Sequence, residues 1–367
     1  MKQQSHKHHY VPEWYQKLFS KNGSLDYLDT KYSYDSKKSL HCYRKTQPAR
    51  CFCEKDLYML KFGEYEDDSI ERYLFGEIDN KGKIAVDNIL GPKGEDGFTP
   101  PCYYQDLLIY MDAQLARTPR TLKLWNALDK NYVLMQMQKI RQLHLTMWFD
   151  SAWEIITAAD DMEFIFSDNP VTFYNRKVFP GSELGKSIMG PNFEWLGTQT
   201  LFPLSAKKLL VLTHMQFARN PGYNPCICRA NPRYFATSIF NAMDVIDYRM
   251  LTREDTLKVN FIIKSRADRF IAASSADFLY PEKNMKHTHW SKIAKNEFLI
   301  PDPRDIYITS GMYATFKDQP AISLNEYGMR QDNEYSIELR EKESKILSER
   351  QKKKYERYGP SGRKLFK

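Results

Sequence analysis

No stretch of the 367-residue sequence is apolar over the ~18–20 residues that a helix needs to cross a bilayer. The first residues are charged and polar, and they lack the apolar segment that a signal peptide carries. The chain has only six cysteines, which fits a reducing compartment better than a disulfide-stapled secreted domain. From these absences we expect a cytoplasmic protein without a membrane segment.

The motifs of several enzyme classes are missing as well. The sequence has no Gly-rich phosphate loop ending in Lys-Ser or Lys-Thr, no H-E-x-x-H pair, no G-x-S-x-G elbow and no kinase signature. A nucleotide-driven motor or a kinase is therefore not expected. The cysteines include two C-x-C pairs, whose spacing is shorter than that of most structural zinc sites. Ordinary buried thiols are the better interpretation of these pairs.

What the sequence does contain is typical of a folded globular protein. Hydrophobic residues make up 42% of the chain, including 24 tyrosines, 21 phenylalanines and 6 tryptophans. The net charge of +8 is moderately basic, and much of the excess lies in the tail from Glu341 to Lys367. We expect one globular domain over residues 1–305, followed by an extension over 306–367 that carries a charged, basic helix.

Apolar periodicity and the positions of proline and glycine predict the secondary structure. A helix is expected to begin after Pro12, because proline fits the first helical turn. Further helices are expected over 68–90, with Gly82 allowing a kink, over 102–159, with a break at Thr118 before a proline, and over 231–250, 255–276 and 333–357. Short strands are expected at 25–29, 57–60, 163–173 and 209–212, and a polar loop over 284–305. The prediction is an α+β fold with a mostly helical body and a small antiparallel sheet.

A cluster of histidines directly precedes the first predicted helix, in the run from Ser5 to Pro12 (SHKHHYVP). Histidine is suited to proton transfer near neutral pH and to metal ligation. Because His8 and His9 are adjacent, their side chains point in different directions. One of them would then serve as general base or metal ligand, and the other would fix the backbone through a hydrogen bond. The alternative is a pair of capping or structural histidines.

Asp168 and Asn169 lie in a Ser-Asp-Asn-Pro turn at the end of an apolar strand. A carboxylate pinned there is well placed to ligate a metal or to orient a histidine. The alternative is a turn-forming role, because Ser, Asp and Asn before proline commonly bond to their own backbone.

Arg117 and Arg120 flank the predicted helix break, where side chains leave the packed face. An arginine there can bind a phosphate or carboxylate through paired hydrogen bonds. Gln114 lies one helical turn before Arg117 and shares its face. The alternative for Arg117 is an internal ion pair with Glu77 or another acid of the preceding helix.

Five short motifs occur in a fixed order along residues 5–280. They are His8–Pro12 (HHYVP) with Trp14, Tyr15 and Phe19, then Gln114 to Pro119 (QLARTP), Phe166 to Val171 (FSDNPV), Pro203-Leu204-Ser205, and Asn260 followed by Ala267-Asp268-Arg269. Together these motifs resemble a prokaryotic family known as domain of unknown function 4238. The family name carries no activity, so the resemblance implies a folded unit without implying its chemistry. The chain departs from the family in its long tail past residue 305.

The polar residues lead to one sharp functional hypothesis, a phosphodiester hydrolase of nuclease type. In it, His8 or His9 is the base or a metal ligand, and Arg117 steadies the phosphate as charge develops. Asp168, with Glu77, would hold a divalent metal such as Mg²⁺ or Mn²⁺. The substrate would be bound by Gln114, Arg120 and Asn169, and the basic tail would hold the nucleic acid.

The alternative hypothesis is a non-enzymatic sensing module, in which the same polar groups recognise a nucleotide, a nucleic acid, a protein partner or a second copy of the chain. A role as effector in prokaryotic anti-phage defence is compatible with the nuclease hypothesis. It rests on association, because orphan prokaryotic families often occur in such systems.

Overall fold

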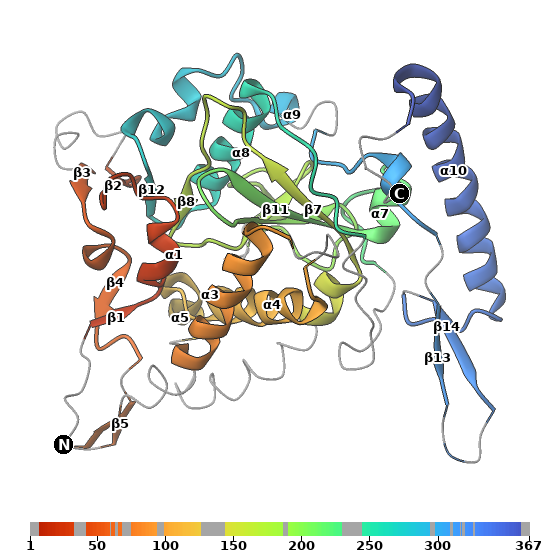
Figure 1. Cartoon of the computed structure of the whole chain (residues 1–367), viewed down its shortest axis with the longest axis horizontal. Coiled ribbons are helices and arrows are strands. Elements are labelled where there is room, and N and C mark those ends of the chain that lie inside the picture. The colour runs from red at the N-terminus through yellow and green to blue at the C-terminus, as the bar shows by residue number, and fades with distance from the viewer. Residues whose placement is uncertain are drawn as a thin grey trace.

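The computed structural model describes residues 7–32, 42–58, 60–62, 65–67, 75–93, 99–125, 144–185, 190–229, 244–293, 298–308, 311–315, 317, 320–325 and 327–360. Within these ranges, two four-stranded sheets carry helices on their faces, and a long helix lies at one end of the molecule (Figure 1). No helix of these ranges is long and apolar enough to cross a membrane.

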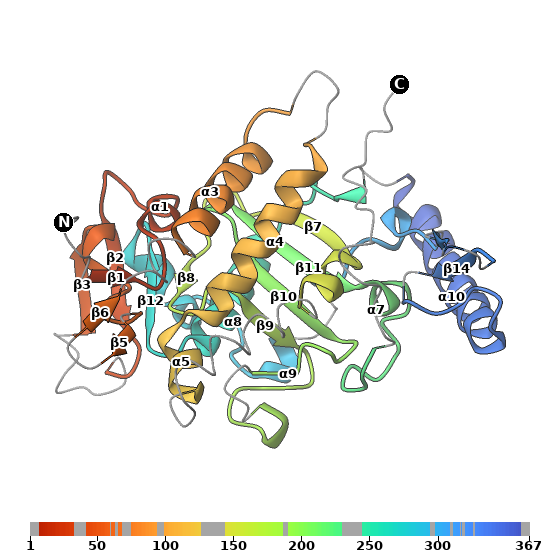
Figure 2. The ribbon, with the colours of Figure 1, turned by 90° about the horizontal axis from the view of Figure 1, so that it is seen from below.

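The central layer is a sheet with the strand order β7-β11-β10-β9, in which every neighbouring pair is antiparallel. Its strands are β7 (Ser151–Thr157), β9 (Thr172–Asn175), β10 (Thr198–Pro203) and β11 (Lys208–His214). Helices α3 (Gly76–Leu90) and α4 (Pro101–Ala116) cover one face, and α8 (Arg253–Arg266) covers the other (Figures 1 and 2).

Strand β11 supplies both hydrophobic cores, because successive residues of a strand point to opposite faces. Leu210 and Leu212 belong to the cluster that contains Leu108 of α4. Leu209 and Val211 belong to the other cluster, which α8 completes with Val259, Ile262 and Ile263. Each of these buried side chains stabilises the fold by about 1.5–3 kcal/mol relative to an exposed one, so both faces of the sheet hold the helices in place.

The second sheet has the order β3-β2-β12-β8 and is built from segments far apart in the sequence. Its strands are β2 (Leu25–Asp29), β3 (Tyr43–Thr46), β8 (Phe166–Ser167) and β12 (Phe270–Ala273). Three two-stranded ribbons add β1 (Lys7–His9) with β4 (Cys53–Lys55), β5 (Leu60–Phe62) with β6 (Tyr65–Asp67), and β13 (Gly311–Ala314) with β14 (Ile322–Asn325).

The remaining named helices are short, except the last. They are α1 (Glu13–Lys17), α5 (Pro119–Trp125), α7 (Met215–Arg219), α9 (Trp290–Ile293) and α10 (Glu334–Tyr358). Single 3₁₀ turns cover Pro48–Arg50, Glu183–Gly185, Ala276–Leu279, Pro281–Lys283 and Pro303–Asp305. Residues 144–149 are also helical.

The terminal helix α10 is docked against the body through α7. Leu347 packs in a small cluster with Ala218 of α7. The fully buried Glu343 accepts a hydrogen bond from the hydroxyl of Tyr327 (2.9 Å) and lies 3.4 Å from Nη1 of Arg219. Arg350 donates to the carbonyls of Ala218 and Arg219 at the end of α7. The predicted division into a domain over residues 1–305 and an extension over 306–367 stays a prediction. The contacts of α10 with α7 connect these two parts of the chain.

Several predicted elements are confirmed. Pro12 is the N-cap of α1, and α4 ends before Arg117 with α5 starting at Pro119. Strands β2 and β11 and helix α10 lie where the pattern predicted them. Helix α3 is continuous through Gly82. The glycine allows Tyr110 of α4 to pack closely against α3, because a Cβ at position 82 would lie 2.5 Å from the Tyr110 ring.

The predicted helix over 102–159 is wrong at its end, where Ser151–Thr157 form strand β7. Both faces of β7 are buried, so Trp153, Ile155 and Ile156 give an apolar run without the alternation of a half-exposed strand. Such a run is indistinguishable from a buried helix by periodicity. Residues 126–143 of that prediction lie outside the described residues.

Two further helix predictions also fail in part. The prediction over 255–276 runs too far, because α8 ends at Arg266 and residues 270–273 form β12. Ala267 is extended there, and the backbone N–H groups that follow bond to Asp168 instead of continuing the helix. Of the prediction over 231–250, residue 244 lies in a 3₁₀ turn, residues 245–250 are not helical, and 231–243 lie outside the described residues.

Smaller elements differ as well. Of the strand predicted at 57–60, residues 57 and 58 lie in a turn, residue 59 lies outside the described residues, and residue 60 begins β5. The predicted loop over 284–305 contains α9. The strand-turn-strand at 163–173 exists, but β8 and β9 belong to different sheets. The combination of helices with antiparallel sheets is confirmed, although two four-stranded sheets stand where one small sheet was expected.

Candidate functional site

Hydrogen bonds connect four of the motif segments. They are the HHYVP segment at the start of α1, the junction of α4 with α5, the turn from β8 to β9, and the C-terminal end of α8. Figure 1 shows α1, α5 and β8 on the same side of the molecule, although they are far apart in sequence. The hydrogen bonds described below link these segments pairwise. The motif residues therefore form one structural junction, which is the candidate site.

His8 is fully buried and holds the backbone of a distant turn. Its Nδ1 accepts a hydrogen bond from the backbone N–H of Tyr58 at 2.9 Å, so Nδ1 carries a lone pair and the ring proton resides on Nε2. The imidazole also stacks on the Tyr58 ring, with 5.5 Å between centroids. The Tyr58 hydroxyl in turn donates to the carbonyl of Arg117 (2.7 Å). His8 thus connects the HHYVP segment to the α4–α5 junction.

Arg117 is fully buried, and its charge is paired. Its Nη1 donates to Oδ2 of Asp79 (3.0 Å), and Nη2 lies 2.8 Å from Oδ1. Gln114 accepts from Nε and Nη2 of the same guanidinium and donates to the carbonyl of Tyr10 (2.6 Å). The expected ion pair with an acid of the preceding helix is confirmed, with Asp79 as the acid. Arg117 and Gln114 therefore bind α4 to α3 and to the HHYVP segment.

Asp168 is buried and accepts three backbone hydrogen bonds. Oδ1 accepts from Asp268 (2.9 Å), and Oδ2 accepts from Arg269 (2.7 Å) and Phe270 (2.8 Å). Burial raises the pKa of Asp168 to about 6, although the three N–H donors favour its charged form. The side chain thereby fixes the turn between α8 and β12, and both of its oxygens are engaged.

The neighbouring turn residues bond mostly among themselves. The Ser167 hydroxyl accepts from the N–H of Asn169 (3.1 Å) and donates to its carbonyl (2.9 Å), which confirms the turn-forming interpretation for Ser167. The side-chain amide of Asn169 differs, because the described residues provide it with no hydrogen-bond partner although the residue is only 6% exposed. Its polar atoms stay available to a ligand.

His9 is half-buried, unlike His8. Its Nε2 lies 3.3 Å from the carbonyl of Ala49, so Nε2 is the donor and Nδ1 carries the lone pair. Within the described part of the chain, no group bonds to Nδ1. Burial lowers the pKa of His9, which keeps the imidazole neutral at neutral pH. Of the two adjacent histidines, His9 has the lone pair that can accept a proton.

Arg120 follows the helix break and is partly buried. Nη1 donates to the carbonyl of Arg266 at the end of α8 (3.0 Å). Burial lowers the pKa of Arg120, and the nearby carboxylates of Asp268 and Asp168 oppose that effect. The remaining N–H groups of Arg120 have no partner among the described residues, so this arginine, in contrast to Arg117, retains donors for a ligand.

Glu77 lies on the exposed side of α3, where it pairs with Lys81 one turn later (2.8 Å). Its side chain is 69% exposed, whereas Asp168 is buried against residues 268–270. In the described ranges, no group of three or more His, Cys, Asp or Glu side chains is arranged to hold a metal ion. The assignment of Asp168 and Glu77 as metal ligands stays a prediction.

A buried Asp–His pair was not identified from the sequence. Nδ1 of His144 lies 2.8 Å from Oδ1 of Asp112, and the ring stacks on Trp148 with 5.5 Å between centroids. Phe193 packs edge-on against the same ring at 4.4 Å. Nothing in the spacing of residues 112 and 144 signals this pair, because the fold brings α4 and residues 144–149 together across a long separation.

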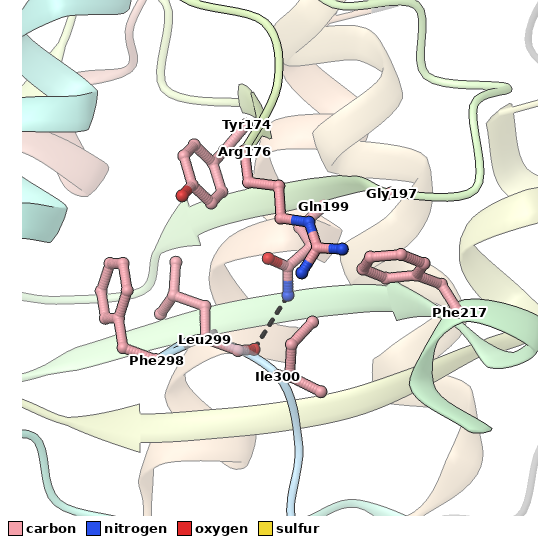
Figure 3. Close-up of a pocket in the computed structure, with 8 residues that line it drawn as sticks. All are labelled: Tyr174, Arg176, Gly197, Gln199, Phe217, Phe298, Leu299 and Ile300. Atoms are coloured by element: carbon pink, nitrogen blue, oxygen red, sulfur yellow. Dashed lines mark hydrogen bonds between the residues drawn. The ribbon is translucent and has the colours of Figure 1, made fainter. Parts of the chain in front are cut away.

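Two hollows in the described structure are poor candidates for a substrate site. One is a cavity of about 10 Å³, large enough for about one water molecule. Figure 3 shows Arg176 and Gln199 among the residues that line it, and Gln199 donates to the carbonyl of Leu299 (2.8 Å). The other is an open surface hollow of about 310 Å³ beside the start of α8, where Thr252 and Lys258 already bond to Asp255.

Comparison with known proteins gives one match. The model of a family described as protein of unknown function (DUF4238) matches residues 7–277. No curated protein and no solved structure matches the chain.

Proposed function

The chain belongs to the DUF4238 family, and from the geometry of its motif junction we propose that it is a phosphodiester hydrolase of nuclease type. The observation that carries the proposal is a difference between neighbouring motif residues in how their polar atoms are bonded. His8 and Arg117 are fully buried and bond internally, whereas His9, Arg120 and Asn169 keep polar atoms without partners in the described residues. The first set builds the site, and the second set is available for chemistry.

His9 is the proposed general base. Its neutral imidazole would take a proton from a water molecule at Nδ1, and the resulting hydroxide would attack phosphorus as the bond to the leaving oxygen breaks. The leaving oxygen would take its proton from solvent. Because Nε2–H is held by the Ala49 carbonyl, the ring is kept in the tautomer that this step needs.

Arg120 is the proposed phosphate contact, in place of the buried Arg117. A guanidinium with open N–H groups stabilises the charge that develops on the phosphate oxygens. Asn169 would donate a further hydrogen bond to the substrate. Gln114, Arg117 and Asp168 act in this proposal as positioning residues, because each is engaged in fixing the backbone of another motif.

The basic end of α10 is the proposed contact for the nucleic-acid backbone. Lys352 and Lys353 are exposed, and Lys354 is partly exposed. Lysines on one helix bind phosphates without reading sequence, and their contribution falls as salt concentration rises. A divalent metal such as Mg²⁺ or Mn²⁺ would assist by polarising the phosphate, and a cytoplasmic effector of anti-phage defence is the proposed setting.

A second candidate function is a non-enzymatic module that binds nucleic acid, nucleotide or a protein partner. The internal bonding of His8, Arg117 and Asp168 favours it, since three of the four predicted catalytic side chains serve as structural anchors. In this alternative the open groups of Arg120 and Asn169 recognise the ligand, and no bond is cleaved.

One experiment separates the two functions. Labelled single-stranded DNA, duplex DNA and RNA are incubated with the purified chain, with Mg²⁺, with Mn²⁺ and with EDTA, and both cleavage and fluorescence polarisation are measured. The hydrolase proposal requires cleavage that His9→Gln loses while binding persists. Binding without cleavage in every condition supports the sensing module and overturns the hydrolase. Loss of growth on induced expression, restored by His9→Gln, tests the defence setting.

A further inference from the structure

Arg266, the last residue of α8, is a buried cation for which the described residues provide no carboxylate. Arg266 is only 5% exposed. Nη2 donates to the carbonyl of Val178 (2.5 Å), and Nε is buried without a hydrogen-bond partner. A buried charge without a counter-charge is costly, and proteins usually pair it or place it beside a ligand.

A second arginine increases this positive charge. Arg120 donates to the backbone carbonyl of Arg266 (3.0 Å), so its guanidinium lies against the C-terminal end of α8, where its charge acts on Arg266. Burial, followed by repulsion from Arg120, lowers the pKa of Arg266 to about 10, so both arginines are still charged at neutral pH. Asp168 and Asp268 act on Arg120, but neither forms an ion pair with Arg266.

The surroundings of Arg266 hold its guanidinium in place and leave one edge open. The guanidinium lies over the ring of Trp290, 5.4 Å from its centroid. Gly190, with φ of +83°, lies beside the same side chain, and a Cβ there would be 3.3 Å from Nη1. Nη1 has no hydrogen-bond partner among the described residues. The glycine thus preserves access to a donor that a larger residue would crowd.

We propose that Arg266 and Arg120 form a binding site for a phosphate dianion, such as inorganic phosphate or the phosphorylated end of a nucleic acid. A phosphate monoester carries about −1.5 to −2 charges at neutral pH, which matches two arginines better than a carboxylate does. Arginine N–H groups also fit the tetrahedral oxygens of phosphate in pairs. The site extends the proposed function, since Arg120 belongs to both, but binding requires no cleavage.

The site is tested by calorimetry and thermal melting with inorganic phosphate at constant ionic strength, on the full chain. We expect phosphate to raise the melting temperature of the wild type. Arg120→Gln should weaken phosphate binding at least about tenfold, as expected for losing hydrogen bonds to a charged group. Arg266→Met should do the same. Arg253→Ala is the matched control, because this arginine lies at the other end of α8 and is more than half exposed.

Two oligonucleotides identify the source of the phosphate. If a 5′-phosphorylated oligonucleotide binds more tightly than its 5′-hydroxyl counterpart, and Arg120→Gln removes the difference, the ligand is a nucleic-acid end. If inorganic phosphate alone binds, the site is confirmed with free phosphate as its ligand. Equal stabilisation of wild type and Arg120→Gln by phosphate is a general salt effect and overturns the proposal. Because Arg120 is only partly buried, we expect Arg120→Gln to fold, so a misfolded Arg266→Met would not decide the outcome.

Discussion

The carboxamide oxygen of Gln114 accepts two hydrogen bonds from the guanidinium of Arg117, at 2.9 Å from Nε and 2.6 Å from Nη2. The same carboxamide donates to the backbone carbonyl of Tyr10. One glutamine therefore satisfies a buried cation and a buried carbonyl at once, and it ties α4 to the segment that carries His8 and His9.

Replacing Gln114 with methionine should destabilise the fold strongly. Methionine has a similar size, but it leaves the Tyr10 carbonyl and two N–H groups of Arg117 without partners, at a cost of about 3 kcal/mol. Urea denaturation measures the change. Gln105→Met on the same helix is the control, because Gln105 is partly exposed and its replacement should change stability by less than about 0.5 kcal/mol. Equal losses in the two variants would contradict the bridging role.

Breaking the ion pair between Asp79 and Arg117 should be strongly destabilising, because Arg117 is fully buried. Asp79→Ala leaves a fully buried arginine without its counter-charge, and breaking a buried pair in this way costs about 3–5 kcal/mol. Glu77→Ala, two residues earlier in α3, removes an exposed carboxylate and should leave the urea midpoint unchanged. An Asp79→Ala variant as stable as Glu77→Ala would show that the pair is not formed.

His9 gives the proposed hydrolase a defined pH dependence. Because burial lowers its pKa, the imidazole stays neutral to a pH below 6.5, and activity should fall only as the pH drops further. His9→Gln should reduce the rate by about 10²–10⁴-fold, the usual contribution of a general base, and should abolish the acid limb of the profile. A variant that retains the wild-type rate and profile would remove His9 from the mechanism. Circular dichroism checks that the variant is folded.

Glu154 should make stability depend on pH. It is 1% exposed, and burial raises its pKa to about 7 against the attraction of Arg249. Between pH 4.5 and 7 the folded chain keeps a proton that the unfolded chain releases, so the free energy of unfolding should fall as the pH rises through this window. The loss attributable to Glu154 is about 3 kcal/mol. Glu154→Gln should show a flatter dependence in urea titrations, and an unchanged slope would refute the assignment.

The docking of α10 can be tested at Tyr327. Its hydroxyl donates to Glu343 and accepts from Arg219, all three residues being buried. Tyr327→Phe removes both bonds and should cost about 1–3 kcal/mol, with faster hydrogen exchange in α10. Tyr335→Phe provides the comparison, because Tyr335 is 61% exposed and its hydroxyl should be dispensable. Equal exchange rates in the two variants would show that α10 is held by other contacts.

The sequence predicted those parts of the fold that depend on local signals. Proline at positions 12 and 119 marked helix starts, and an ion pair with an acid of the preceding helix was the alternative interpretation of Arg117. Strand β7 was missed because burial on both faces hides the alternation of a strand. The end of α8 was missed because it depends on Asp168, almost a hundred residues earlier in the chain.

The site was predicted less completely than the fold. The pattern included His9, Arg120 and Asn169 among the candidates, but it could not separate them from neighbours whose side chains bond internally, since burial decides between His8 and His9. Arg266 and the pair of Asp112 with His144 carry no motif at all. Their surroundings come from α9, from the loop at Gly190 and from residues 144–149, and a sequence does not reveal which segments will meet.

Residues 168–171 separate β8 in one sheet from β9 in the other. Four residues span at most about 14 Å when fully extended, and the Asp168 carboxylate anchors this link to three consecutive backbone N–H groups. Because this link is short and anchored at Asp168, the two sheets have little freedom to slide or rotate against each other. A force applied to one of these sheets is therefore transmitted to the other through this link.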